Sequence, residues 1–184
     1  MEFAAIDFES AGTSKGGTDA PVQIGWALMR GGEIDAGSLF ESYLQCASPI
    51  AWAAQKIHGI TTQDLAGAPA LASLWPRLKA ALGGRVVVAH GAGAEKRFLR
   101  AFPLHGFGPW LDTITLARHF FPGLTDYSLA SVCDALELTA EIQRLCPAGQ
   151  WHQALFDAVA CLAIVQKVQS LPEHDASVLR PFIR

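Results

Sequence analysis

Several features that would assign a sequence to a broad class are missing here. Charged residues make up only 17% of the chain and balance to a net charge of −3, so no basic field draws the whole molecule to nucleic acid. No apolar run approaches the roughly 18 residues of a membrane span. The start, MEFAAID, lacks the basic and apolar regions of a signal peptide. We therefore expect a cytoplasmic protein without a membrane association.

Cysteine pairs of the CxxC type are also absent, and two of the four cysteines, Cys133 and Cys161, fall in apolar helical patterns where buried, reduced thiols are expected. Hydrophobic residues, in contrast, are plentiful at 51% of 184 residues, which is enough for the core of one average domain. No repeat or composition break divides the chain. We expect one domain over residues 1–170 and a C-terminal tail over residues 171–184, where two prolines occur.

The hydrophobic period changes once along the chain. Residues 3–8, 21–29 and 33–44 are typical of strands, and the Gly31-Gly32 pair between the last two permits a tight hairpin. The remainder alternates helical patterns with two further strands, the β-branched RVVVAH and the start of WLDTITLARHFF. This order predicts an α/β fold in which one mixed sheet carries helices on its faces.

Two carboxylates interrupt the first apolar segment, EFAAIDFESAG. Residues two apart on a strand point to the same face, so Asp7 and Glu9 would lie side by side. Burial and mutual repulsion destabilise such a pair, and Mg²⁺ or Mn²⁺, which prefer hard oxygen ligands, would relieve both effects. The alternative is that Glu9 lies beyond the strand end in solvent and that Asp7 caps a turn.

A histidine and an acid stand five apart in WHQALFDAVACLA. On a regular helix His152 and Asp157 would differ by about 140° and would not share a face. They converge if His152 lies in a loop just before the helix, which the preceding CPAGQW favours through its proline and glycine. The alternative is that His152 is a surface or capping histidine and that Asp157 is a solvated acid on the helix.

A glycine-rich turn, HGAGAE, follows the apolar strand RVVVAH. It lacks the third glycine and the ribose-binding acid of a dinucleotide site, so a nucleotide-cofactor enzyme is the weaker alternative. Glu95 in a first helical turn also suits the helix dipole, which is a structural reason for its presence.

Together these segments resemble the DEDDh 3′–5′ exonucleases, a DnaQ-like family that includes the proofreading epsilon subunit of bacterial DNA polymerase III. Six motifs match in order over nearly the whole chain. They are DFESAG (family D-x-E-T-T-G), VQIGWAL, KIHGITTQDL (H-G-I-T), AHGAGAEKRFL (AHNAxFDxxFL), LDTITLARHFFPGLTDYSLASVC (LDTLxLAR and YSL), and the H-x4-D pair His152 and Asp157.

The resemblance implies a ribonuclease H-like mixed sheet, three antiparallel strands and then parallel strands, with helices on both faces. It implies a metal-dependent 3′–5′ exonuclease that removes nucleoside 5′-monophosphates from the 3′ ends of single-stranded DNA or RNA with two divalent cations, Mg²⁺ or Mn²⁺. Four acids would hold the cations, namely Asp7, Glu9, Glu95 and Asp157, and His152 would act as general base. Three roles stay open for the tail, residues 171–184: packing on its own domain, docking on a polymerase, or pairing with a second copy of the chain.

The family match also assigns Ser10, Ala11, Gly12 and His58 to contacts with the terminal nucleotide, although His58 is equally well explained as a hydrogen-bonded turn residue.

One departure affects the second catalytic motif. Glu95 stands where the family has an aspartate, and its side chain is one methylene longer. Asp112 is its rival as a fourth ligand, but a place at a helix start favours capping. The departure also motivates an alternative function, a catalytically weak nucleic-acid-binding module on the same fold.

Overall fold

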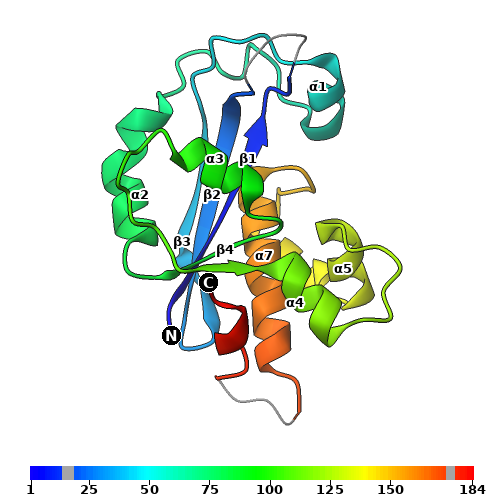
Figure 1. The fold of residues 1–184 in the computed structure, drawn as a ribbon. Coiled ribbons are helices and arrows are strands. Elements are labelled where there is room, and N and C mark those ends of the chain that lie inside the picture. The colour runs from blue at the N-terminus through cyan, green and yellow to red at the C-terminus, as the bar shows by residue number, and fades with distance from the viewer. Residues whose placement is uncertain (14–18, 173–176) are drawn as a thin grey trace.

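A five-stranded mixed sheet forms the centre of the computed structural model, which describes residues 1–13, 19–172 and 177–184 (Figure 1). Its strands are β1 (Phe3–Ser10), β2 (Pro21–Arg30), β3 (Glu33–Tyr43), β4 (Val86–Ala89) and β5 (Trp110–Asp112). They lie in the order β3-β2-β1-β4-β5. The first three pair antiparallel, whereas β4 runs parallel to β1 and β5 parallel to β4. The predicted ribonuclease H-like arrangement of strands is confirmed.

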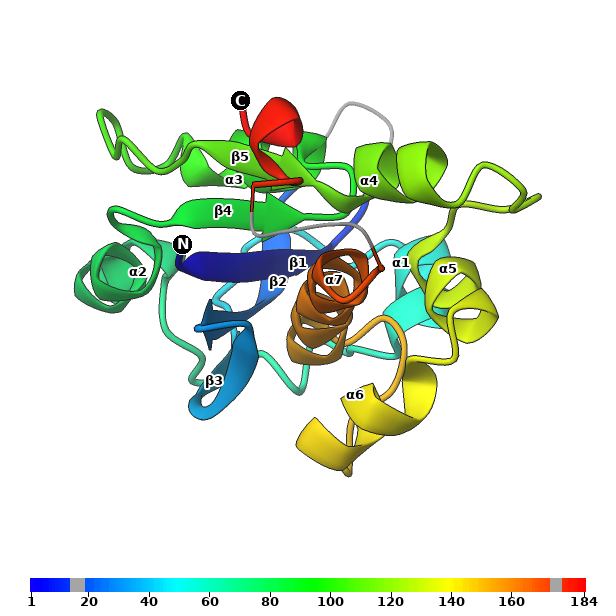
Figure 2. The same ribbon diagram turned by 90° about the horizontal axis from the view of Figure 1, so that it is seen from below.

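Helices cover both faces of this sheet (Figure 2). They are α1 (Trp52–His58), α2 (Trp75–Leu82), α3 (Gly93–Leu99), α4 (Thr113–Phe120), α5 (Leu129–Ala135), α6 (Thr139–Leu145) and α7 (Ala154–Gln169), with short 3-10 helices at Leu71–Leu74 and Arg180–Phe182. One core joins the sheet to α2 and α3, and the other joins it to α4–α7. Helix α6 was not anticipated from the sequence; Glu137 adopts a left-handed φ of 60° that separates α6 from α5.

Strand β1 contributes side chains to both cores in alternation. Phe3 and Ala5 belong to the core that contains α7, whereas Ile6 belongs to the core that contains α2 and α3. Because β1 continues to Ser10, Asp7 and Glu9 extend the row of Phe3 and Ala5 toward α7. Glu9 therefore lies inside the strand and not beyond its end.

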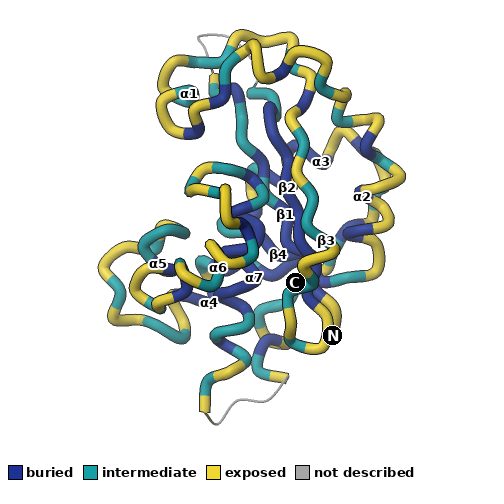
Figure 3. Tube along the Cα trace, turned by 180° about the vertical axis from the view of Figure 1, so that it is seen from behind, coloured by how far each residue is buried: buried dark blue, intermediate teal, exposed yellow. Residues whose placement is uncertain are grey.

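Helix α7 is buried along most of its length, between the sheet and α4–α6 (Figure 3). Its buried residues are apolar with one exception, Asp157, which is 8% exposed. A carboxylate on a buried helix is expensive in free energy unless a hydrogen bond or a cation compensates it. The burial of Asp157 therefore requires a compensating partner, which the apolar residues of the helix do not need.

The described part of the C-terminal tail packs onto its own domain. Arg184 and Trp110 exchange two backbone hydrogen bonds, of 2.7 and 2.9 Å, along the free edge of β5. Leu179 is fully buried, and the ring of Phe182 contacts those of His119 and Phe120. The predicted tail, residues 171–184, falls partly outside the described residues, as does the predicted loop after β1. No helix in the described ranges has the length and apolar character needed to cross a membrane.

Candidate active site

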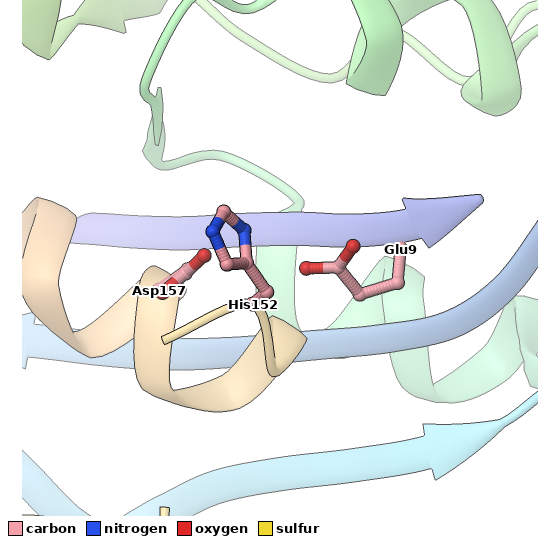
Figure 4. Close-up of side chains that lie close together, drawn as sticks. All are labelled: Glu9, His152 and Asp157. Atoms are coloured by element: carbon pink, nitrogen blue, oxygen red, sulfur yellow. The ribbon is translucent and has the colours of Figure 1, made fainter. Parts of the chain in front are cut away.

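Three of the predicted site residues meet at one end of the sheet. Glu9 comes from the end of β1, Asp157 from the first turn of α7, and His152 from the turn that precedes α7. One potential ligand atom of each lies within 4.8 Å of those of the other two. Figure 4 shows the imidazole of His152 between the two carboxyl groups. The prediction that His152 and Asp157 converge, although five apart in sequence, is confirmed.

Two residues of β2 hold the start of α7 against the sheet. Gly25 pairs with Asp7 in the sheet register, and a Cβ on Gly25 would lie only 2.2 Å from the backbone nitrogen of Leu155. Buried Gln23 accepts a hydrogen bond of 3.0 Å from the backbone N–H of Ala154 through its Oε1. The VQIG motif therefore lets α7 approach closely and brings Asp157 to β1. Sequence reasoning assigned these residues no role; the signal was a lone glutamine in an apolar strand.

The backbone at His152 is left-handed, with a φ of 65°, which is uncommon for a residue other than glycine. This conformation turns the chain into α7 and leaves the side chain exposed beside the acids. The backbone N–H of His152 also donates to the carboxylate of Asp157. Uncommon backbone conformations of this kind persist where the surrounding structure fixes them, and functional sites are enriched in them.

All four predicted acids have raised pKa values, and burial is the main cause for each. The pKa of Glu9 rises to about 8, through burial and the charges of Asp157 and Glu95. Burial raises the pKa of Asp157 to about 7, although the bond from His152 opposes it, and raises that of Glu95 to about 7. The pKa of Asp7 lies well above its usual range because of burial and the three neighbouring acids. The cluster therefore favours protons or cations over free carboxylates.

The donor set fits a divalent cation. Two buried carboxylate oxygens, Asp157 Oδ1 and Glu95 Oε2, have no hydrogen-bond partner. Buried oxygens without partners are rare in folded proteins, and a bound ion is one of the accepted reasons for them. Carboxylate oxygens are hard ligands, which suit Mg²⁺ or Mn²⁺ among the common divalent ions.

Asp7 and Glu95 do not belong to the close set of three. The charge of Glu95 raises the pKa values of both Glu9 and Asp7, and the charges of Asp157 and Glu9 also raise that of Asp7. Asp7 and Glu95 are therefore electrostatically coupled to the close set. Asp112, the rival ligand, accepts hydrogen bonds from the backbone N–H groups of Gly91 (3.1 Å) and Ile114 (2.9 Å). It caps α4, as its position at a helix start predicted.

The segment expected to touch the terminal nucleotide is fixed by α1. His58 is buried; its Nδ1 accepts from the backbone N–H of Ile60 and its Nε2 donates to the carbonyl oxygen of Ser10. With both nitrogens engaged, this ring fits the interpretation as a hydrogen-bonded turn residue. Ala11 is fully buried and Gly12, with a φ of 73°, packs on Ala54 of α1. The side chain of Ala11 therefore packs in the protein interior and supports this segment from there.

Comparison with known proteins agrees with the geometry. The exonuclease family model RNase T matches residues 4–165. The chain belongs to this exonuclease family. The chain is 32% identical, over 87% of its length, to a DNA polymerase III subunit epsilon-like protein of Rhodobacter capsulatus. It is 26% identical, over 86% of its length, to a PolC-type DNA polymerase III of Bacillus cereus. It spans only 22% and 11% of these two relatives.

Solved structures show that the chain shares the fold of known nucleases. Exonuclease X, solved with 5′ overhanging duplex DNA, has a TM-score of 0.76 at 24% identity, and the match covers 98% of both chains. The nuclease domain of 3′hExo, described as a DEDDh family member and bound to rAMP, has a TM-score of 0.72 at 14% identity, over 91% of this chain and 90% of that one. The resemblance to DEDDh exonucleases found in the sequence is confirmed.

Proposed function

We propose that the protein is a metal-dependent 3′–5′ exonuclease that hydrolyses the last phosphodiester bond of a single-stranded DNA or RNA and releases nucleoside 5′-monophosphates. The observation that carries the proposal is the meeting of Glu9, His152 and Asp157 within 4.8 Å, with buried carboxylate oxygens that lack partners. A buried acid cluster of this kind has no structural benefit by itself, since burial and repulsion both oppose its charge.

The acids of this chain would hold two divalent cations, Mg²⁺ or Mn²⁺. Glu9 and Asp157 are the ligands that the geometry favours, with Asp7 and Glu95 completing the negative charge around them. When bound, such ions lower the pKa of an attacking water and stabilise charge on the leaving 3′ oxygen. The cations would also reverse the local field, which otherwise repels a phosphate.

His152 would accept the proton of the attacking water on an imidazole nitrogen. Its side chain is exposed and its turn lies next to both Glu9 and Asp157, so it can reach a water at the cluster without displacing buried atoms. The segment of Ser10 and Gly12, supported by Ala11 and His58, would position the terminal nucleotide. The similarity to polymerase III subunits supports a polymerase as partner.

The test is a product assay. A single-stranded oligonucleotide labelled at its 5′ end is incubated with the protein and Mg²⁺ or Mn²⁺. We expect progressive shortening from the 3′ end, release of 5′-mononucleotides and complete inhibition by EDTA. The Glu9→Gln variant should lose at least 100-fold in rate, whereas Lys79→Ala, an exposed change on α2, serves as the matched control. Equal rates for the wild type and Glu9→Gln, or no mononucleotides with either metal, would refute the proposal.

A further inference from the structure

One tryptophan is set apart from the other four. Within the fold, Trp26 stacks on Phe40 and Trp75 on Phe102, Trp110 donates its indole N–H to the carbonyl oxygen of Phe107, and Trp151 packs edge-on against Phe156. Trp52, on the first turn of α1, is 71% exposed. Its ring contact is the ammonium of Lys56, one turn along the helix and 4.3 Å from the ring centroid. Among the described residues, packing in the fold therefore explains four tryptophans, whereas Trp52 is left largely exposed.

The exposed face of α1 combines apolar surface with positive charge. Ala53 and Ile57 lie beside Trp52 and Lys56 and are also exposed, Ile57 by 58%. The helix carries no acidic residue, although the chain as a whole is acidic. An exposed aromatic ring that can stack on a base, beside an ammonium that can meet a phosphate, is the combination with which proteins bind single strands. Figure 3 shows this exposed stretch of α1.

Helix α1 is joined directly to the segment that follows Glu9. The backbone N–H of Ala51 donates to the carbonyl oxygen of Ala11 (2.7 Å), and His58 bonds the carbonyl oxygen of Ser10 (3.1 Å). Ser10 follows Glu9 directly in β1, so the end of α1 is bonded to the residue next to the acid cluster. A strand whose 3′ end sits at the acids therefore has α1 next to its path.

We propose that Trp52 and Lys56 form a binding platform for a nucleotide upstream of the scissile bond, with the indole stacking on its base and the ammonium contacting its phosphate. The inference rests on the proposed function for the direction of the strand. Because stacking reads the face of a base and not its edge, the platform accepts DNA and RNA of any sequence. Its effect is on affinity and on the preferred length of substrate.

Binding of a fluorescent thymidine octanucleotide, and of the matching uridine octanucleotide, is measured by anisotropy with Ca²⁺. Trp52→Ala should weaken binding about 5- to 100-fold, and Trp52→Phe should restore most of it. Lys56→Ala should make the slope of log K against log salt concentration shallower by about 0.7, which corresponds to the loss of one phosphate contact. The matched control is Lys79→Ala, because Lys79 lies over Trp75 on α2 in the same arrangement, 6.0 Å from the ring, and should change neither quantity.

The outcomes separate this inference from the proposed function. If the wild type degrades oligonucleotides and Trp52→Ala binds them as tightly as the wild type, the platform is refuted and the exonuclease stands. If no hydrolysis occurs but Trp52→Ala still weakens binding, the exonuclease proposal fails and the platform stands. Sedimentation that shows a wild-type dimer and a monomeric Trp52→Ala variant, with equal binding, would assign α1 to self-association and overturn the inference.

Discussion

The pKa of Asp157 leads to a prediction with an unusual sign: its replacement by asparagine should stabilise the metal-free protein. Folding raises this pKa from 3.8 to about 7. The contribution of such a carboxyl group to the free energy of unfolding is fully present below pH ~4 and is lost as the pH rises through the folded pKa. By pH ~8 the loss amounts to about 4 kcal/mol. Asparagine keeps the shape and the acceptor for His152 but carries no charge.

Because the new amide also needs partners in a buried site, we expect a smaller net gain for Asp157→Asn, about 1–3 kcal/mol at pH ~8. For a chain of this length the gain corresponds to a rise in Tm of about 3–10 °C. It should shrink toward zero near pH ~4. With saturating Mg²⁺ the order should reverse, since the wild type gains stability from the bound ion and the variant loses a ligand.

Calorimetric unfolding in EDTA and in Mg²⁺, at several pH values, checks this reasoning. Asp126→Asn is the matched control, for which the change in stability should have the opposite sign. Asp126 accepts hydrogen bonds from Ser131 and Ser128, which lower its pKa to about 2. Removing this carboxylate should therefore destabilise the protein above pH ~4. A less stable Asp157→Asn in EDTA at pH ~8, or one stabilised by Mg²⁺ as strongly as the wild type, would refute the assignment of Asp157 to a desolvated metal site.

Three further predictions concern neighbouring residues. Gly25→Ala should lower the free energy of unfolding, measured in urea, by about 3 kcal/mol or more, because the new Cβ would meet the backbone of α7. Gly123→Ala, where nothing lies within 4 Å of the new Cβ, should be nearly neutral, and equal losses would contradict the close approach of α7. His152→Ala should lower kcat about 100- to 10,000-fold in steady-state assays and leave the Mn²⁺ affinity nearly unchanged, and a matching loss of affinity would make the imidazole a ligand instead of a base. Glu95→Asp should change the rate less than about tenfold; a larger gain would show that the longer side chain compromises the natural site.

The hydrophobic period of the sequence was sufficient to predict the mixed sheet and to predict that Asp7 and Glu9 lie side by side. Alternation along β1 places Asp7 and Glu9 on one face whatever lies opposite, because that rule depends only on backbone geometry. The Pro and Gly residues before α7 in turn placed His152 outside the helix, which allowed the convergence with Asp157 that the structure shows.

Other features depend on contacts between distant segments and could not be predicted. Nothing in the local pattern tells that Gly25 faces the backbone of Leu155, 130 residues later, or that Gln23 caps α7. The same limit applies to Trp52: five tryptophans look alike in the sequence, and only the packed structure shows which of them is left exposed. From the sequence His58 had two interpretations, and the hydrogen bonds made by both of its ring nitrogens fit that of a turn residue.

We propose that the acids from β1, α3 and α7 are partly protonated in the free protein and release these protons when divalent cations bind. Titration calorimetry of Mn²⁺ binding in two buffers of different ionisation enthalpy measures that exchange directly. With pKa values of about 7 to 8 at Glu9, Glu95 and Asp157, we expect release of roughly one proton or more per molecule at pH ~7. Binding without proton release, or equal Mn²⁺ affinity in wild type and Asp157→Asn, would contradict it.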